Sequence, residues 1–239
     1  MSALVVAAGA GVAAGALMQS ATGFGFSLMA APLVFAAVDP RPAVALLTLL
    51  GTEVNLLTIG SERRRPQPLW PACGAMLAFA APGALVGVVV LRALPAVALQ
   101  VAVTLGVLGT LAARRVREAH VPAPVAGFAA GALTTSTTTS GPPLLLHLLG
   151  LEATPGQIRD SVTVCFLGLS VLGVSALAVT GTLAFPDATL TLALVPVVAL
   201  AHLAGRRVFA RLAAQGHYEP VLNGILVLAV VVGLVSTLA

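Results

Sequence analysis

Charged residues are scarce in this chain. Only 8% of its 239 residues are charged, whereas 59% are hydrophobic, and a soluble domain carries roughly a quarter charged residues. The apolar stretches repeatedly reach the ~20 residues that a helix needs to cross a bilayer. We therefore expect an all-α polytopic membrane protein whose main partner is the lipid bilayer and which has almost no soluble part.

Several other features are also missing. Lysine is absent, and the twelve basic residues are arginines that lie between apolar segments, where they signal topology and not a nucleic-acid surface. No phosphate-binding loop of the Walker type is present, and no His, Cys, Asp and Glu residues have metal-ligand spacing, so neither a cofactor nor a metal is expected. Cys73 and Cys165 lie singly in apolar runs and are expected to be buried thiols without a disulfide.

The first apolar run, residues 3–38, is too long to be one straight helix. Such a helix would span ~54 Å, whereas the hydrocarbon core of a bilayer is ~30 Å thick. Polar residues and glycines interrupt the run near its middle, and Thr22-Gly23-Phe24-Gly25 is the expected break. Non-helical backbone at that depth must be buried in protein or must line a cavity.

A second copy of this interrupted segment follows in the other half of the chain. GALMQSATGFGFSLMAAP at Gly15–Pro32 aligns with GALTTSTTTSGPP at Gly131–Pro143 when the sequence is shifted by 116 positions, which pairs Ser20 with Ser136 and Thr22 with Thr138. A polar, glycine-broken apolar segment in each half indicates the binding site of a transporter built from repeats. The expected repeats are residues 1–118 and 119–239.

Each repeat is expected to contain one motif segment and three plainer transmembrane helices. The plain helices are expected at residues 43–59, 69–91 and 96–112 of the first repeat, and at residues 161–179, 188–204 and 221–238 of the second. Residues 152–160 are expected to form a polar connection. Arg206, Arg207 and Arg211 are expected to lie in a loop after residue 204.

The arginines decide between two topologies. If each motif segment crosses the membrane once, they divide six against six, but if each is a hairpin that returns to the same side, they divide ten against two, with only Arg41 and Arg92 opposed. Only the second division satisfies the positive-inside rule. We therefore predict two inverted repeats, each a broken or re-entrant helical hairpin plus three transmembrane helices. Two short full crossings in place of each hairpin would give the same sidedness.

Hydroxyl, amide and glycine residues of the two motifs are the candidate substrate-binding residues. Hydroxyl groups donate hydrogen bonds to anions, and a broken helix adds unpaired N–H groups and the positive end of its dipole. Such a site holds a small oxyanion without a positively charged side chain in the membrane. The alternative is that these small residues only pack helices. The candidates are Gln19, Ser20, Thr22, Gly23, Gly25, Thr135, Ser136, Thr137, Thr138, Thr139, Ser140 and Gly141.

Glu53 is the candidate for coupling transport to protons, because an acid within a membrane helix is costly and marks function. At an offset of 115, Thr48 aligns with Thr163 and Asn55 with Ser170, and Thr48, Asn55 and Thr163 are expected to support the coupling or binding site. His147 and His202 are expected to be packing residues or, in the alternative, proton relays.

The paired motifs resemble those of the sulfite exporter TauE/SafE family of membrane permeases. The four-plus-four layout, the charged loop after the second segment and the length also fit, although Thr22-Gly23-Phe24-Gly25 stands where a glycine run is often found. The resemblance implies a multi-pass permease of the bacterial inner membrane, not an enzyme, that moves sulfite, a sulfonate or a related organic anion such as a carboxylate by alternating access.

Two other readings stay open from the sequence. One is an intramembrane enzyme that uses Glu53 with His147 or His202, and the other is a non-transporting membrane subunit of a larger complex. The duplication of a polar hairpin argues against the enzyme, because catalysis rarely needs two copies. The sequence leaves open the exact substrate, the direction of transport, the coupling ion and whether the protein is a homo-oligomer.

The inverted-repeat topology predicts where the ends of the chain lie. Reporter fusions should place both termini on the extracytoplasmic side and the loops at Arg63–Arg65 and Arg114–Arg117 in the cytoplasm, where the positive-inside rule retains arginine-rich loops. A cytoplasmic C-terminus would contradict this topology.

Overall fold

The computed structural model describes residues 3–61, 65–95, 97–99, 101–102, 105 and 121–215. All regular secondary structure in these ranges is helical, as predicted. Five of the described helices are long and apolar enough to cross a membrane. The last expected segment, most of the segment at 96–112, and the arginines at positions 63, 64, 114, 115 and 117 lie outside the described residues.

Both motif segments are broken helices. Helix α1 (Ala3–Thr22) ends at the predicted break and α2 (Phe26–Ala37) begins after it. Gly23 and Gly25 have φ angles of 89° and 106°, a left-handed conformation that glycine adopts without steric cost.

The second motif divides in the same way. Helix α6 (Ala123–Ser136) ends within the run of hydroxyl residues, and α7 (Gly141–Leu149) restarts directly after it. Pro142 and Pro143 occupy the first turn of α7, where the missing proline N–H has no intrahelical partner to lose.

The plain helices that the structure describes match the expected segments in number and order. They are α3 (Pro40–Ser61), α4 (Trp70–Ala93), α8 (Pro155–Val179) and α9 (Ala188–Gln215). Cys73 in α4 and Cys165 in α8 are buried free thiols, as predicted.

Two expected boundaries are wrong. Residues 155–160 belong to α8 and not to a connection, because a capping box starts the helix early: the Thr154 hydroxyl accepts from the Gln157 N–H, and the Gln157 side chain accepts from the Thr154 N–H. Arg206, Arg207 and Arg211 lie within α9 and not in a loop. Arginine is a good helix former, and its long side chain can reach toward water from a helix end.

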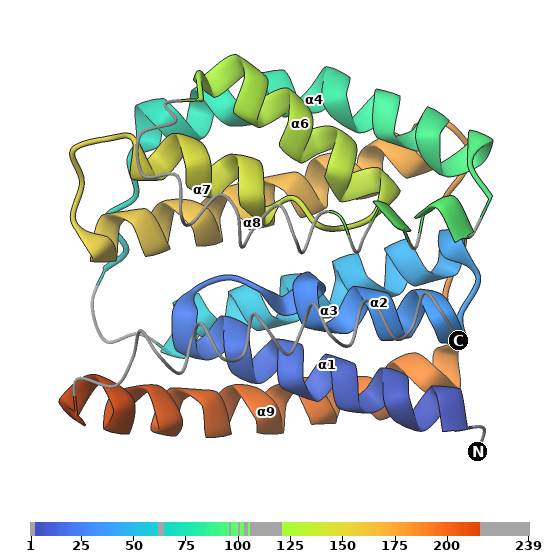
Figure 1. Ribbon diagram of the computed structural model, residues 1–239, viewed down its shortest axis with the longest axis horizontal. Helices are drawn as coiled ribbons and strands as arrows, with labels where there is room; N and C mark the ends of the chain where they lie inside the picture. Colours follow the sequence, from blue (N-terminus) through green and yellow to red (C-terminus); the bar gives the residue numbers. More distant parts are fainter. Residues whose placement is uncertain are drawn as a thin grey trace.

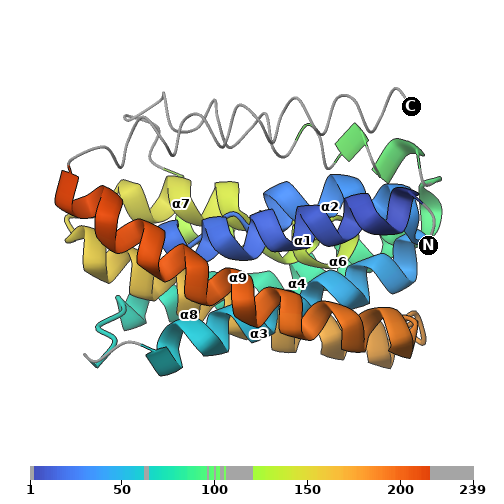
Figure 2. The same cartoon turned by 90° about the horizontal axis from the view of Figure 1, so that it is seen from below.

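The helices form two groups, and each group contains one helix from the other half of the sequence. Figures 1 and 2 show α1, α2 and α3 lying with α9, whereas α6, α7 and α8 lie with α4. Helix α4 packs along α6, and α9 packs along α1. Each half is therefore held to the other by a long interhelical contact.

Glycines set the spacing between α4 and α6. Gly83 and Gly87 are four residues apart on α4, and Gly127 and Gly131 have the same spacing on α6. A side chain on any of the four would overlap a backbone carbonyl oxygen of the opposite helix. This small-residue spacing lets two membrane helices approach closely, so that van der Waals contact and weak hydrogen bonds can hold them.

This contact predicts an unequal response to two alanine substitutions. Gly131→Ala should destabilise the protein by about 1–3 kcal/mol, because the methyl group overpacks the contact with α4. Gly74→Ala, on an exposed turn of α4 where a methyl group meets nothing within 4 Å, should be neutral or stabilising by up to about 1 kcal/mol. Thermal unfolding in detergent measures both, and equal stabilities would contradict the close packing.

Candidate functional site

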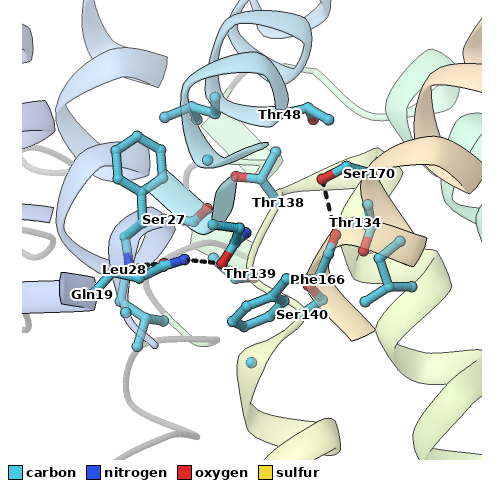
Figure 3. Close-up of a pocket in the computed structure, with 17 residues that line it drawn as sticks. Gln19, Ser27, Leu28, Thr48, Thr134, Thr138, Thr139, Ser140, Phe166 and Ser170 are labelled. Atoms are coloured by element: carbon cyan, nitrogen blue, oxygen red, sulfur yellow. Dashed lines mark hydrogen bonds between the residues drawn. The ribbon is translucent and has the colours of Figure 1, made fainter. Parts of the chain in front are cut away.

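A cavity of about 60 Å³ lies where the two broken helices meet. On this measure a water molecule needs about 10–15 Å³, so the cavity has room for a small ion or a few waters. Figure 3 shows hydroxyl and amide side chains from both halves around it. Its wall consists of Gln19, Gly25, Phe26, Ser27, Leu28, Leu47, Thr48, Gly51, Asn55, Thr134, Thr138, Thr139, Ser140, Gly141, Phe166, Leu169 and Ser170.

Two helix N-termini meet this cavity. Helix α2 begins at Phe26 and α7 begins at Gly141, and both residues line the wall. The first N–H groups of a helix lack intrahelical partners, and the helix dipole makes this end partly positive. Both features favour an anion at this point.

The two N-termini differ in the donors that they supply. In α2 the first-turn residues Ser27 and Leu28 line the cavity, and each has a backbone N–H. In α7 the residues after Gly141 are Pro142 and Pro143, which have no N–H. The first broken helix therefore contributes more backbone donors than the second, whose contribution comes chiefly from hydroxyl side chains.

Gln19 fixes the geometry of the first break. Its Oε1 accepts a hydrogen bond of 3.0 Å from the Phe26 N–H, and its Nε2 donates to Asn55 Oδ1 at 2.6 Å. One side chain thus ties the end of α1 to the start of α2 and to the middle of α3. Gln19 and Asn55 were both candidates from the sequence, and the structure places both in the cavity wall.

The second break contributes hydroxyl groups. Thr134, Thr138, Thr139 and Ser140 line the cavity. Thr137 does not line it, but its Oγ1 lies 2.8 Å from Thr139 Oγ1. Thr138 has a φ angle of 60°, which costs a β-branched residue about 1–3 kcal/mol. Strain of this kind persists where the surrounding structure imposes it, and it concentrates at functional sites.

Three other candidates of the second motif, Thr135, Ser136 and Thr137, do not line the cavity. The Thr135 hydroxyl donates to the Ala84 carbonyl of α4 at 2.7 Å and so belongs to the α4–α6 contact. The Ser136 hydroxyl donates to its own helix, at the Ala132 carbonyl. The sequence alignment found these residues but could not tell which side of the helix faces the other motif.

The first motif is divided in the same manner. Gly25 lines the cavity, whereas Ser20 faces α9, with its Oγ 2.7 Å from His202 Nδ1. Gly23 packs against Arg159 of α8: a methyl group on Gly23 would lie 2.6 Å from Arg159 Cγ. The structure does not describe the side chain of Thr22.

Arg159 is a positively charged side chain beside the first break that the sequence did not predict. The capping box at Thr154 brings Arg159 into α8, inside a candidate membrane span. Its side chain covers Gly23 at the first break, next to the cavity wall. The sequence had predicted that residues 152–160 form a connection, which placed Arg159 outside the helix.

The supporting residues are also divided. Thr48 lines the cavity, while its hydroxyl donates to the Val44 carbonyl at 2.7 Å. Thr163 is buried outside the cavity and donates to the Arg159 carbonyl. Glu53 does not line the cavity, and its Oε2 is buried without a hydrogen-bond partner among the described residues.

The side chains of the enzyme alternative do not assemble at the cavity. Glu53, His147 and His202 are all absent from its wall. His147 Nδ1 lies 2.8 Å from the Val121 carbonyl oxygen and so ties α7 to the residues that precede α6. Nothing in the cavity wall pairs a nucleophile with one of these groups.

Sequence reasoning missed most of the walls that α3 and α8 provide. On α3, Leu47 and Gly51 join Thr48 and Asn55 on one helix face, and on α8 Phe166 and Leu169 join Ser170. The alignment of Asn55 with Ser170 at an offset of 115 was the available signal, because both residues line the cavity.

A multi-pass helical membrane protein in which two broken helices meet at a small polar cavity has the architecture of a secondary transporter. Residues 7–234 match the family Sulfite exporter TauE/SafE, and the chain belongs to this family of membrane transporters. The resemblance in the paired motifs is thereby confirmed over nearly the whole chain. No curated protein and no solved structure matches the chain.

The strained backbone at Thr138 gives a test of the second break. Thr138→Gly should raise the free energy of unfolding by about 1 kcal/mol, because glycine adopts a positive φ without the steric cost that threonine bears. Thr138→Val, which keeps the branched Cβ, should show no such gain. Thermal unfolding measures both, and a Thr138→Gly variant less stable than the parent would contradict the strain.

Proposed function

We propose that this chain is a secondary transporter of a small oxyanion, with sulfite as the substrate and sulfonates and small carboxylates as related anions. The observation that carries the proposal is the meeting of the α2 and α7 N-termini at one cavity. Family membership supports the same substrate class.

The size and charge of the cavity fit such a substrate. Sulfite is a compact anion, and a cavity of about 60 Å³ holds a small ion. None of the described wall residues is an aspartate or glutamate that would repel an anion, while Ser27, Thr139 and Ser140 carry hydroxyl groups that can donate to one. Arg159, which packs on Gly23, adds positive charge beside the first break.

The directions of the helices support the inverted repeats. In Figure 1, α1 and α6 run in opposite directions along the long axis, and so do α3 and α8 and also α4 and α9. These pairs correspond under the sequence offsets of 115 and 116. Related halves of opposite orientation are typical of transporters that open alternately to the two faces of the membrane.

The cavity lies between the two helix groups. One wall comes from α1, α2 and α3, and the other comes from α6, α7 and α8. A rocking movement of one group against the other would open the cavity to one face and then to the other. The glycine contact between α4 and α6 and the packing of α9 on α1 lie within the groups, so they can persist during this movement.

Sulfite uptake by the purified chain in proteoliposomes tests the function. Accumulation or exchange of labelled sulfite by this chain alone would separate a transporter from a subunit that needs a partner. Liposomes without protein give the background. Uptake no greater than this background for sulfite, sulfonates and carboxylates would contradict the proposal.

Removal of single hydroxyl groups from the wall should weaken sulfite binding. Losing a hydrogen bond to a charged group costs about 1.5–3 kcal/mol, which is about tenfold to somewhat over a hundredfold in affinity. We expect this loss for Ser140→Ala and for Ser27→Ala, measured as the dissociation constant for sulfite.

Two controls accompany these variants. Ser136→Ala removes the same kind of hydroxyl outside the cavity wall, and Leu192→Ala shortens a side chain that is 73% exposed; both should bind sulfite like the parent. If Ser136→Ala weakened binding and the two wall variants did not, the site would follow the sequence alignment and not the cavity.

A further inference from the structure

His202 of α9 is held by hydroxyl groups on two other helices. Its Nδ1 lies 2.7 Å from Ser20 Oγ of α1, and its Nε2 lies 3.3 Å from Ser61 Oγ at the end of α3. The imidazole is only 2% exposed. It therefore joins α9 to the broken helix α1 and to α3 at once.

Both serine hydroxyl groups also face backbone carbonyl oxygens. Ser20 Oγ lies 2.7 Å from the Ala16 carbonyl oxygen, and Ser61 Oγ lies 3.1 Å from that of Thr58. Each hydroxyl has one proton to donate and can also accept. The four contacts can therefore be counted proton by proton.

Only a protonated imidazole satisfies all four contacts with one proton each. In the imidazolium both nitrogens donate, one to Ser20 and the other to Ser61, so each serine keeps its own proton for its backbone carbonyl. In a neutral imidazole one nitrogen must accept, and one serine must then turn its proton away from its carbonyl. The geometry is thus that of a site which accommodates an added proton.

Two arginines lie among the described charged groups that act on His202. Arg206, on the same helix, donates to the Ser61 carbonyl at 3.0 Å, and both Arg206 and Arg159 act electrostatically on the imidazole. Helix α1 carries no ionisable side chain, and Glu53 of α3 precedes Ser61 by eight residues, which is about 12 Å along a helix. A negative charge near the first break would offset the repulsion between an imidazolium and the two arginines.

The anion cavity begins one residue from this network. Gln19, which lines the cavity, directly precedes Ser20, and Arg159 packs on Gly23 in the same break. An anion in the cavity therefore contacts the same broken helix that carries Ser20, the serine hydrogen-bonded to His202. Ser61 is only half-buried, so it offers the imidazole Nε2 a route to water.

We propose that His202 is a proton-binding site that takes up a proton when the cavity takes up its anion, so that the two bind together. This proposal rests on the proposed function. The proton comes from water at Nε2, and it returns to water when the anion leaves. The ligand of this second site is the proton alone, and Ser20 and Ser61 are its positioning residues.

The test is the dissociation constant for sulfite as a function of pH, in the parent protein and in His202→Gln. Both proteins meet the same mixture of sulfite species, so the ratio of their constants cancels the titration of sulfite itself. Linkage to one proton changes an affinity by at most about tenfold per pH unit. As the pH falls, the parent should bind sulfite increasingly tightly relative to His202→Gln. The ratio of the two dissociation constants should change by up to about tenfold per pH unit.

Two further variants guard against misfolding and misassignment. Ser61→Ala, which keeps the imidazole and its contact with Ser20 but removes the acceptor of Nε2–H, should lower the pH dependence. His147→Gln removes another buried histidine, whose Nδ1 lies 2.8 Å from the Val121 carbonyl oxygen, and should keep the parental pH dependence.

The outcomes separate the two proposals. If the parent binds sulfite and the His202→Gln and Ser61→Ala variants retain its pH dependence, His202 is not the proton site. If Glu53→Gln removes the pH dependence and His202→Gln does not, the proton belongs to Glu53. If the parent binds no sulfite at any pH, the proposed function falls, and this inference falls with it.

Discussion

A helix that stops inside a membrane must find partners for the backbone groups that it exposes, and the structure is built around two such stops. Lipid offers no hydrogen bonds, so each break has to be enclosed by other helices or to line a cavity. At the first break Gln19 accepts from the Phe26 N–H and is itself held by Asn55. At the second, the hydroxyl groups of consecutive threonines and Ser140 surround the restart of α7. What remains between the two breaks is a small polar space with two positive helix ends.

The two halves meet this constraint with different chemistry. The first break uses glycines of positive φ and a glutamine, and it is covered by Arg159. The second uses hydroxyl side chains and two prolines, and its helix α6 is fixed against α4 through glycines. The corresponding contact of α1 with α9 also contains a glycine, Gly205, packed against the Leu17 carbonyl, and it adds a hydrogen-bonded histidine, His202. Both broken helices are thus held by close packing at glycines, and α1 is held in addition by a group that can titrate.

The sequence predicted the parts of the fold that depend on local pattern. The break at Thr22–Gly25 followed from the length of the apolar run, and the plain helices followed from hydropathy. The early start of α8 was missed, although the Thr154 and Gln157 pair is a readable capping box. The Gly83–Gly87 and Gly127–Gly131 spacings were also visible but were not used.

For the site, Gln19, Asn55 and the hydroxyl run were found, but alignment could not show that Ser20 and Ser136 turn away from the cavity. Which face of a helix meets another depends on packing between distant segments, and a single sequence does not contain that contact.

We propose that the anion binds between the N-termini of α2 and α7. The most direct measurement is a crystal structure of the protein soaked with selenite, the selenium analogue of sulfite, with the selenium atom located by its anomalous scattering. The account predicts one selenium peak in the cavity, between the first turn of α2 at Phe26 and Ser27 and that of α7 at Ser140 and Gly141. A selenium peak elsewhere in the protein, with none in the cavity at saturating selenite, would contradict it.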